Sequence, residues 1–278
     1  MPPRGPLGPM SRRRWLKTAA VVGSGALTGL AFYGYANERH RLQLTRARVP
    51  VAGLSPAFEG LSIALLTDLH RSETVAHGFI QRAVALAMTG RPDLVVLGGD
   101  YVTWRNRAFA DDCARALSGL AAPLGVFAVL GNHDDDRDVP AALARQGFSV
   151  LRDVRTRLSV RGERLDLVGI RFWTRSAKDI APLLRGAASN SILLAHDPRM
   201  LREAAALGIP LVLSGHTHGG QVVLPGIGAI LRRRFPVSQG LGHAGGSTVF
   251  VSRGVGTVYV PIRLNCPPEV SLLTLTRG

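Results

Sequence analysis

Short apolar runs that end in polar or glycine-rich turns recur along the chain. Residues 61–67 form the first run and residues 94–97 the second, and the apolar spacing over 76–88 between them predicts a helix. A helix around 109–120 then leads to a third run at 126–130. Strands that alternate with helices in this way are typical of an α/β fold built on a parallel sheet.

The second half of the chain contains more strands than helices. The expected elements are a helix over 141–146, a hairpin of 158–160 with 165–170, strands at 192–195 and 211–213, and strand-like runs at 221–224, 247–251 and 270–275. The last three runs indicate a second, more antiparallel sheet packed against the first. We therefore expect an α/β fold of two stacked mixed β-sheets flanked by helices.

The N-terminal segment has a different pattern. Residues 11–17, Ser-Arg-Arg-Arg-Trp-Leu-Lys, resemble the bacterial twin-arginine export signal, with tryptophan where that motif usually has phenylalanine. Residues 18–36 carry no charge and would reach about 28 Å as a helix, close to the thickness of a bilayer's hydrocarbon core. Because residues 34–36 also offer a small-x-small cleavage site, residues 1–36 are expected to be either a cleaved signal peptide or a retained anchor. This export route would place the protein on the outer face of the cytoplasmic membrane, in the periplasm or in the cell wall.

Composition limits the rest of the chain to one large domain. Residues 37–48 have the charge density of a linker, and the domain is expected to span 49–278. The formal charge of +15 favours anionic partners such as phosphate esters or acidic lipid surfaces. Nucleic acid is not expected, because aromatic and basic residues do not alternate as they do in base-stacking surfaces. The two cysteines, Cys113 and Cys266, predict no disulfide framework.

Side chains that can bind metals follow directly after the predicted strands. They occur in the turns Thr-Asp-Leu-His, Gly-Gly-Asp, Gly-Asn-His-Asp, Ala-His-Asp-Pro and Gly-His-Thr-His, and are Asp68, His70, Asp100, Asn132, His196, His216 and His218. Oxygen and imidazole ligands suit divalent Mn, Fe, Co or Zn, and α/β sheets bind ligands at the carboxyl ends of their strands. A lone aspartate here is ordinarily a helix cap, and a lone histidine is ordinarily a core residue. The set as a whole instead predicts a two-metal site.

These five motifs, in this order, resemble the calcineurin-like metallophosphoesterase superfamily over about residues 61–276. Gly-His-Thr-His-Gly-Gly-Gln and the tail Asn-Cys-Pro-Pro-Glu are similar to the exported bacterial phosphoesterases of the YkuE and YaeI group. The resemblance implies a four-layer αββα metallophosphoesterase sandwich and two divalent ions, Mn²⁺ first and Fe, Zn or Co as alternatives. It implies that one ion is held by Asp68, His70, Asp100 and His218, and the other by Asp100, Asn132, His196 and His216.

The activity implied is hydrolysis of a phosphate monoester, diester or pyrophosphate by direct attack of a hydroxide that bridges the two ions. The catalytic residues would be Asp100 and His133, the latter matching the family histidine that contacts phosphate and can protonate the leaving oxygen. Family members with Gly-Asp-x-x-Asp have a second acid that can orient this histidine, whereas this chain has Thr103 there. Either another group orients His133, with Asp134 and Asp135 as candidates, or general-acid help is weak and activated leaving groups are preferred.

The segment after the last predicted ligand combines apolar residues with Arg232, Arg233 and Arg234. Together with Asn132 and His133, these arginines are the candidate substrate-binding residues, since guanidinium groups suit phosphate and apolar neighbours suit acyl chains. A solvated charge run is the other interpretation of the arginines. We expect a monomeric phosphohydrolase acting on an envelope substrate such as a phospholipid or glycolipid, and associated with the membrane through the N-terminal segment if that segment is not cleaved. The alternative is a catalytically weak metal-binding module that holds a partner at the envelope.

Overall fold

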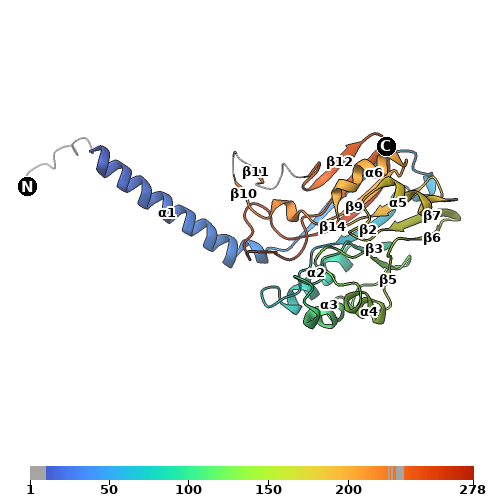
Figure 1. The fold of residues 1–278 in the computed structure, drawn as a ribbon, viewed down its shortest axis with the longest axis horizontal. Helices are drawn as coiled ribbons and strands as arrows, with labels where there is room; N and C mark the ends of the chain where they lie inside the picture. The colour runs from blue at the N-terminus through green and yellow to red at the C-terminus, as the bar shows by residue number, and fades with distance from the viewer. Residues whose placement is uncertain (1–10, 225, 227, 230–234) are drawn as a thin grey trace, which may run out of the picture.

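The computed structural model of the chain describes residues 11–224, 226, 228–229 and 235–278. Arg232, Arg233 and Arg234 lie outside the described residues. The body contains two six-stranded sheets and a two-stranded ribbon of β10 (Val223–Leu224) with β11 (Gly228–Ala229). The two large mixed sheets and their flanking helices confirm the predicted fold class (Figure 1).

The first sheet has the strand order β1-β14-β2-β3-β4-β5. Its strands are β1 (Gln43–Val51), β14 (Glu269–Arg277), β2 (Ser62–Leu66), β3 (Leu94–Leu97), β4 (Val126–Ala128) and β5 (Ser149–Val150). Strands β2 to β5 run parallel, whereas β14 is antiparallel to β2 and parallel to β1. Residues 37–48, expected as a linker, contain the 3-10 helix η1 (Glu38–His40) and the start of β1, where Gln43 lies opposite Glu269.

The second sheet has the order β12-β13-β9-β8-β7-β6. Its strands are β12 (Gly240–Ala244), β13 (Ser247–Val251), β9 (Leu211–Ser214), β8 (Ser191–Leu194), β7 (Glu163–Gly169) and β6 (Val154–Val160). The three inner pairs are parallel, and only the outer pairs β12-β13 and β7-β6 are antiparallel.

The second sheet is more antiparallel than the first, as predicted, with two antiparallel strand pairs against one, but the strands predicted for it are partly wrong. Residues 270–275 belong to β14 in the first sheet, and residues 221–224 contribute to the β10-β11 ribbon. β13 does join the second sheet, where it runs antiparallel to β12 and parallel to β9. Because all of β13 is buried, it lacks the polar alternation that marks an antiparallel strand with one face in water.

Alternate residues of the central strands face different layers. In β2, Ile63 and Leu65 pack between the two sheets, whereas Ala64 and Leu66 pack against the helices. Residues 94–97 of β3 show the same alternation. Since both faces of these strands are covered, they appear in the sequence as continuous apolar runs.

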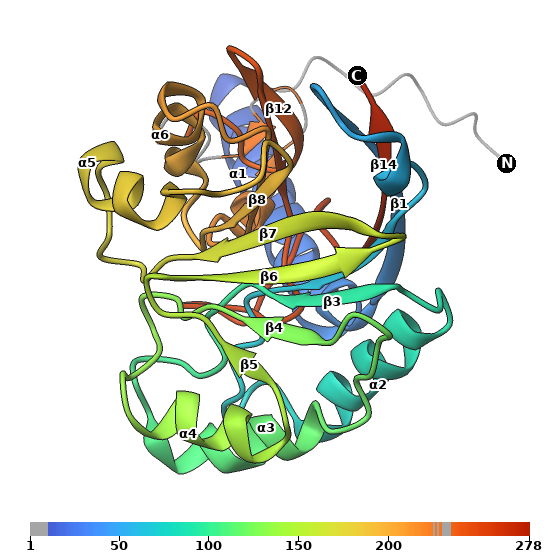
Figure 2. The same ribbon diagram turned by 90° about the vertical axis from the view of Figure 1, so that its right-hand side faces the viewer.

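Helices cover the outer face of each sheet. α2 (His77–Met88), α3 (Ala110–Ala116) and α4 (Asp138–Arg145) lie on the first sheet, and α5 (Ala177–Ile180) and α6 (Leu201–Ala206) lie on the second (Figure 2). Further 3-10 turns are η2 (Pro56–Phe58), η3 (Arg107–Phe109), η4 (Ala181–Leu184), η5 (Pro198–Met200) and η6 (His218–Gly220). The order of layers is helices, sheet, sheet, helices.

Helix α1 (Arg12–Ala36) extends away from this body (Figure 1). Its apolar side chains are exposed, with Val21 at 73% and Leu27 at 68%, and Gly34 is its one buried residue. The helical stretch Arg12–His40 contains an 18-residue window that is long and apolar enough to cross a membrane. α1 is therefore a candidate signal sequence or membrane anchor.

Candidate metal centre

The carboxyl ends of strands from both sheets meet at one edge of the sandwich. Strands β2, β3 and β4 of the first sheet and β8 and β9 of the second all end there. The turns that follow them carry, in chain order, Asp68, His70, Asp100, Asn132, His196, His216 and His218. Each candidate ligand therefore lies just beyond a strand, where α/β sheets place their functional residues.

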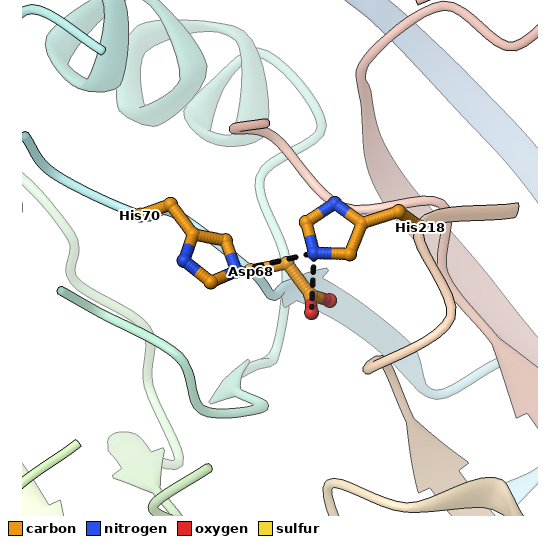
Figure 3. A group of neighbouring side chains, drawn as sticks. All are labelled: Asp68, His70 and His218. Carbon is orange, nitrogen blue, oxygen red and sulfur yellow. Dashed lines mark hydrogen bonds and ion pairs between the residues drawn. The ribbon is translucent and has the colours of Figure 1, made fainter. Parts of the chain in front are cut away.

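Two groups of side chains in these turns could each hold a metal ion. The first group is Asp68, His70 and His218, and the second is Asp100, His196 and His216. Within each group, the potential ligand atoms all lie within 4.8 Å of one another. Figure 3 shows the first group, in which dashed lines join the His218 ring to the His70 ring and to the Asp68 carboxylate.

The two histidines of the first group face each other through nitrogen atoms. His70 Nε2 and His218 Nε2 lie 3.1 Å apart, and Asp68 Oδ1 lies 3.4 Å from His218 Nε2 (Figure 3). Burial lowers the pKa of His70 to about 3, and burial with His70 and Arg263 nearby lowers the pKa of His218 well below its ordinary value. Both rings are therefore neutral at pH 7, which is the form that binds a metal ion.

Asp100 spans the two groups. Its Oδ2 lies 3.5 Å from His70 Nε2 and 3.2 Å from His196 Nε2, while its Oδ1 accepts the backbone N–H of His133 at 2.9 Å. Two nearby dications repel each other unless an anion is shared between them. Oδ2 of Asp100 is placed to be that anion. Burial opposes ionisation, yet His196 holds the pKa of Asp100 below its usual range. Asp100 is therefore a carboxylate at neutral pH.

Buried polar atoms without partners test whether these residues fit metal ions. Asn132 Oδ1 is buried and has no hydrogen-bond partner, and the buried His196 Nε2 makes no regular hydrogen bond, with Asp100 Oδ2 3.2 Å away. His196 Nδ1 donates to the Gly98 carbonyl at 2.7 Å, so Nε2 is the atom that faces Asp100. Burial alone would lower the pKa of His196, but Asp100 and Asp68 raise it to about 10, and a metal ion bound at Nε2 would displace that proton. Buried polar atoms normally have partners, and amide oxygen and imidazole nitrogen both bind divalent ions. The residues present therefore fit two metal ions.

Five of the candidate ligand residues adopt unfavourable backbone conformations. Left-handed φ values occur at Asp68 (53°), His70 (48°), Asp100 (58°), His216 (72°) and His218 (50°). Each such conformation costs a non-glycine residue about 1–3 kcal/mol, and such strain concentrates at functional sites. Hydrogen bonds between the turns support these conformations. The backbone N–H of His216 donates to both carboxylate oxygens of Asp68, at 3.0 and 3.1 Å.

Asp134 connects the turns after β3 and β4. Its carboxylate accepts three backbone N–H bonds of 2.8 Å, from Asp100, Tyr101 and Gly131. A side chain at Gly131 would collide with Asp100 Oδ1, so glycine is required at this close approach. Asp134 therefore acts as a structural support for Asp100.

His133 is oriented by the backbone of Trp104. The Trp104 N–H donates to His133 Nδ1 at 3.1 Å, so the neutral ring carries its proton on Nε2. Burial lowers the pKa of His133 and favours this neutral ring. Asp134 and Asp135, the orienting acids considered from the sequence, accept backbone N–H bonds elsewhere; Asp135 accepts those at the start of α4.

Arg263 was not identified from the sequence and lies directly behind the first ligand group. It is fully buried, and its guanidinium lies 3.5 Å from His218 Nδ1. It donates to the carbonyl oxygens of Arg253, Gly254, Gly256 and Cys266. A lone arginine in a loop has no periodicity or spacing that marks it; the only signal is its place just before the Asn-Cys-Pro-Pro-Glu tail.

Positive charge lies on the opposite side, beside the second ligand group. The ring of Phe235 lies 5.3 Å from that of His216, and next to Phe235 is a cavity of about 480 Å³. The lining of this cavity includes the basic residues Arg175, Arg199 and Arg202. Arg175 and Arg199 also pair with Asp197, which fixes their positions. A fixed cationic wall of this kind attracts anionic substrates.

Comparison with known proteins agrees with this geometry. Residues 61–220 match the family model described as calcineurin-like phosphoesterase. The chain is 29% identical to the uncharacterized metallophosphoesterase YkuE of Bacillus subtilis, over 96% of this chain and 98% of YkuE. It is 32% identical to the phosphodiesterase YaeI of Escherichia coli, over 96% of this chain and 99% of YaeI.

A solved structure shows the same fold at low identity. The sulfate thiohydrolase SoxB of Thermus thermophilus superposes with a TM-score of 0.51 at 14% identity, over 81% of this chain and 58% of SoxB. The fold, the family model and the relatives lead to one conclusion: this chain belongs to the calcineurin-like phosphoesterase family.

Proposed function

We propose that this protein is a dinuclear-metal-dependent phosphohydrolase that cleaves phosphate monoester, diester or pyrophosphate bonds at the cell envelope. The observation that supports it most is the position of Asp100 Oδ2 between His70 of one ligand group and His196 of the other. One ion would be held by Asp68, His70, Asp100 and His218, and the other by Asp100, Asn132, His196 and His216. Mn²⁺ is the expected metal, with Fe, Zn or Co as alternatives, because mixed oxygen and nitrogen sites accept several ions.

The chain's own residues position the substrate and supply a proton donor. When bound, the two ions polarise the phosphoryl oxygens and activate water for attack on phosphorus. His133 presents its Nε2–H to the substrate because the Trp104 N–H occupies Nδ1. A positioned donor that protonates a leaving oxygen contributes about 100- to 10,000-fold to the rate. The arginine-lined cavity beside Phe235 supports an anionic substrate on the other side.

We also propose that α1 remains attached as a membrane anchor after twin-arginine export. The candidate cleavage site at residues 34–36 includes Gly34, which is buried and whose carbonyl accepts the Arg263 N–H at 3.3 Å. Next to it, the buried Glu38 accepts the Cys266 N–H at 2.7 Å. A bovine relative, 29% identical over 97% of this chain, is named transmembrane protein with metallophosphoesterase domain. The outer face of the cytoplasmic membrane is the corresponding location.

Hydrolysis assays on the purified full chain test the proposed activity. With Mn²⁺ added, the protein is expected to hydrolyse para-nitrophenyl phosphate or its bis ester. Asp100→Ala and His218→Ala should abolish turnover, whereas the exposed Asp136→Ala serves as the control. Unchanged turnover in both ligand variants, with intact metal content, would exclude this site as the catalytic centre. Metal binding and tight partner binding without turnover of any ester would instead favour a binding module.

A further inference from the structure

We propose that the cavity framed by Trp104 and Tyr259 binds the hydrocarbon chain of a membrane-inserted phosphate ester while the phosphate lies at the metal centre. This inference rests on the proposed phosphohydrolase function and specifies its substrate class. The cavity has a volume of about 530 Å³ and lies beside His133, on the side opposite the arginine-lined cavity.

Two exposed aromatic side chains form the edge of this cavity. Trp104 is 65% exposed and Tyr259 is 72% exposed, and their rings meet edge to face with centroids 5.3 Å apart. The ring of His133 lies 4.8 Å from Trp104 and 6.2 Å from Tyr259. Both aromatic residues have left-handed φ values, 52° and 61°, a conformation that is costly for non-glycine residues and is enriched at functional sites. Large apolar surface is thus held open next to the proposed proton donor.

The lining of the cavity indicates what it can hold. Phe109, Val258, Val260 and Pro261 contribute apolar walls, and hydroxyl side chains with the Asn106 amide contribute the uncharged polar part. Among the described residues, the one charged member of the lining is Glu73, an acid. A second phosphate would be repelled here, whereas an uncharged apolar group would be favoured.

A second, more apolar cavity extends the first toward the membrane helix. It has a volume of about 310 Å³ and shares Thr74 and Thr257 with the first cavity. Phe79 lines it, as does Arg39 of η1, which directly follows α1. Arg82 lies at the same end, with its guanidinium 5.0 Å from the ring of Phe79. Arginines beside apolar walls suit the boundary between lipid headgroups and hydrocarbon.

The loop that carries the cavity wall also contacts α1. Val260, which is 50% exposed, is followed closely by Arg263, whose N–H donates to Gly34 of α1. The two cavities therefore lie between the metal centre and the end of the helix proposed to leave the membrane. A lipid chain is favoured over a soluble ring compound because only a lipid accounts for an apolar path that ends at α1.

Paired substrates that differ in one chain test this proposal. The full chain is reconstituted with Mn²⁺ in phosphatidylcholine nanodiscs, and kcat/KM is measured for para-nitrophenyl dodecyl phosphate and para-nitrophenyl methyl phosphate, which share a leaving group. Val260→Asp places a charge in the apolar wall and should lower the dodecyl-to-methyl ratio at least about tenfold. The matched control Val154→Asp changes a valine that is 44% exposed on β6, outside both cavities, and should keep the wild-type ratio.

Binding of non-hydrolysable analogues separates this proposal from the proposed activity. Val260→Asp should weaken dodecylphosphonate about tenfold by calorimetry and leave ethylphosphonate unchanged. An unaltered dodecyl-to-methyl ratio together with unaltered dodecylphosphonate binding in Val260→Asp would overturn the lipid proposal. A preference for para-nitrophenyl thymidine phosphate over the dodecyl ester that depends on Val260 would overturn it as well. If the wild type hydrolyses no ester but binds dodecylphosphonate through Val260, the phosphohydrolase function fails while the hydrocarbon site stands.

Discussion

Thr103 Oγ1 lies 3.2 Å from Nδ1 of His70. An imidazole that donates from Nδ1 to a hydroxyl keeps its lone pair on Nε2, and Nε2 is the atom of His70 that faces Asp100. Thr103 occupies the place where family members with Gly-Asp-x-x-Asp have a carboxylate, but it contacts a candidate ligand rather than His133. The backbone of Trp104 orients His133 instead. Although the family carboxylate is absent, both histidines are therefore oriented: His70 by the Thr103 hydroxyl and His133 by the Trp104 N–H.

Thr103→Val is expected to lower metal affinity about 10- to 100-fold, because groups that orient a metal ligand typically contribute that much. The substitution preserves shape but removes the hydroxyl that bonds His70. Metal affinity is measured by competition with a fluorescent chelator, and Thr103→Ser, which retains the hydroxyl, is the control. Equal affinities in the valine and serine variants would show that the hydroxyl does not orient His70.

Arg263→Met is expected to destabilise the fold by at least about 3 kcal/mol, because it leaves several buried carbonyl oxygens without donors at roughly 1–3 kcal/mol each. Arg263 is fully buried and donates to four residues around the first ligand group. Urea unfolding measures the loss. Arg137→Met, at a side chain that is 85% exposed, is the matched control and should leave the free energy of unfolding within about 0.5 kcal/mol of the wild type. A small effect at Arg263 would mean that water replaces its hydrogen bonds.

Strand positions and candidate metal-binding residues could be predicted because both leave a local signal in the sequence. Residues 94–97 are four apolar residues that end at a glycine turn, and β3 occupies the same four positions. His216 and His218 follow β9 directly, and their residue types limit the chemistry available. A buried strand followed by a metal-binding side chain needs no knowledge of distant residues to be recognised.

Partner strands and side-chain contacts could not be predicted, because they depend on residues distant in sequence. β14 is as apolar as a strand of the second sheet would be, yet it pairs with β1 and β2 at the edge of the first. From residue type alone, Asp134 was a candidate to orient His133 and Thr103 was excluded from that role. In the structure, Asp134 accepts backbone N–H bonds and Thr103 contacts His70. Residue type defines what a side chain can bond, and tertiary packing selects the partner.

Asp166 is expected to make folding stability depend on pH in the acid range. Burial opposes its charge, but hydrogen bonds from Arg164 and the Ala188 N–H, with Arg155 nearby, hold the pKa of Asp166 below its ordinary value. A carboxyl with a depressed folded pKa stabilises the fold fully above its unfolded pKa of about 4, and this contribution is lost as the pH falls through the folded pKa.

Asp166→Asn should therefore lower the free energy of unfolding by about 1–3 kcal/mol at pH 7, and the difference from wild type should shrink as the pH falls below about 4. Urea unfolding at both ends of this range gives the measurement, and subtraction from wild type removes the contribution of metal ligands common to both proteins. Asp136→Asn, at an exposed carboxylate, is the control. A difference that stays constant with pH would show that packing rather than charge is responsible.

Gly34→Leu is expected to detach the end of α1 from the body, because a Cβ at Gly34 would lie 2.6 Å from the Arg263 carbonyl oxygen and 2.7 Å from Ile262 Cγ2. In nanodiscs the variant should be cut by protease within residues 37–42 at least about tenfold faster than wild type, since local opening exposes the backbone there. Gly29→Leu is the matched control, because nothing lies within 4 Å of a Cβ at that position. Equal cleavage rates in the two variants would contradict the docking of α1 on the body. An exported protein that begins at Asn37, as measured by mass spectrometry, would contradict the retention of α1 as an anchor. Faster cleavage in the Gly34 variant alone would show that the anchor and the loop carrying Arg263 form one packed unit next to His218.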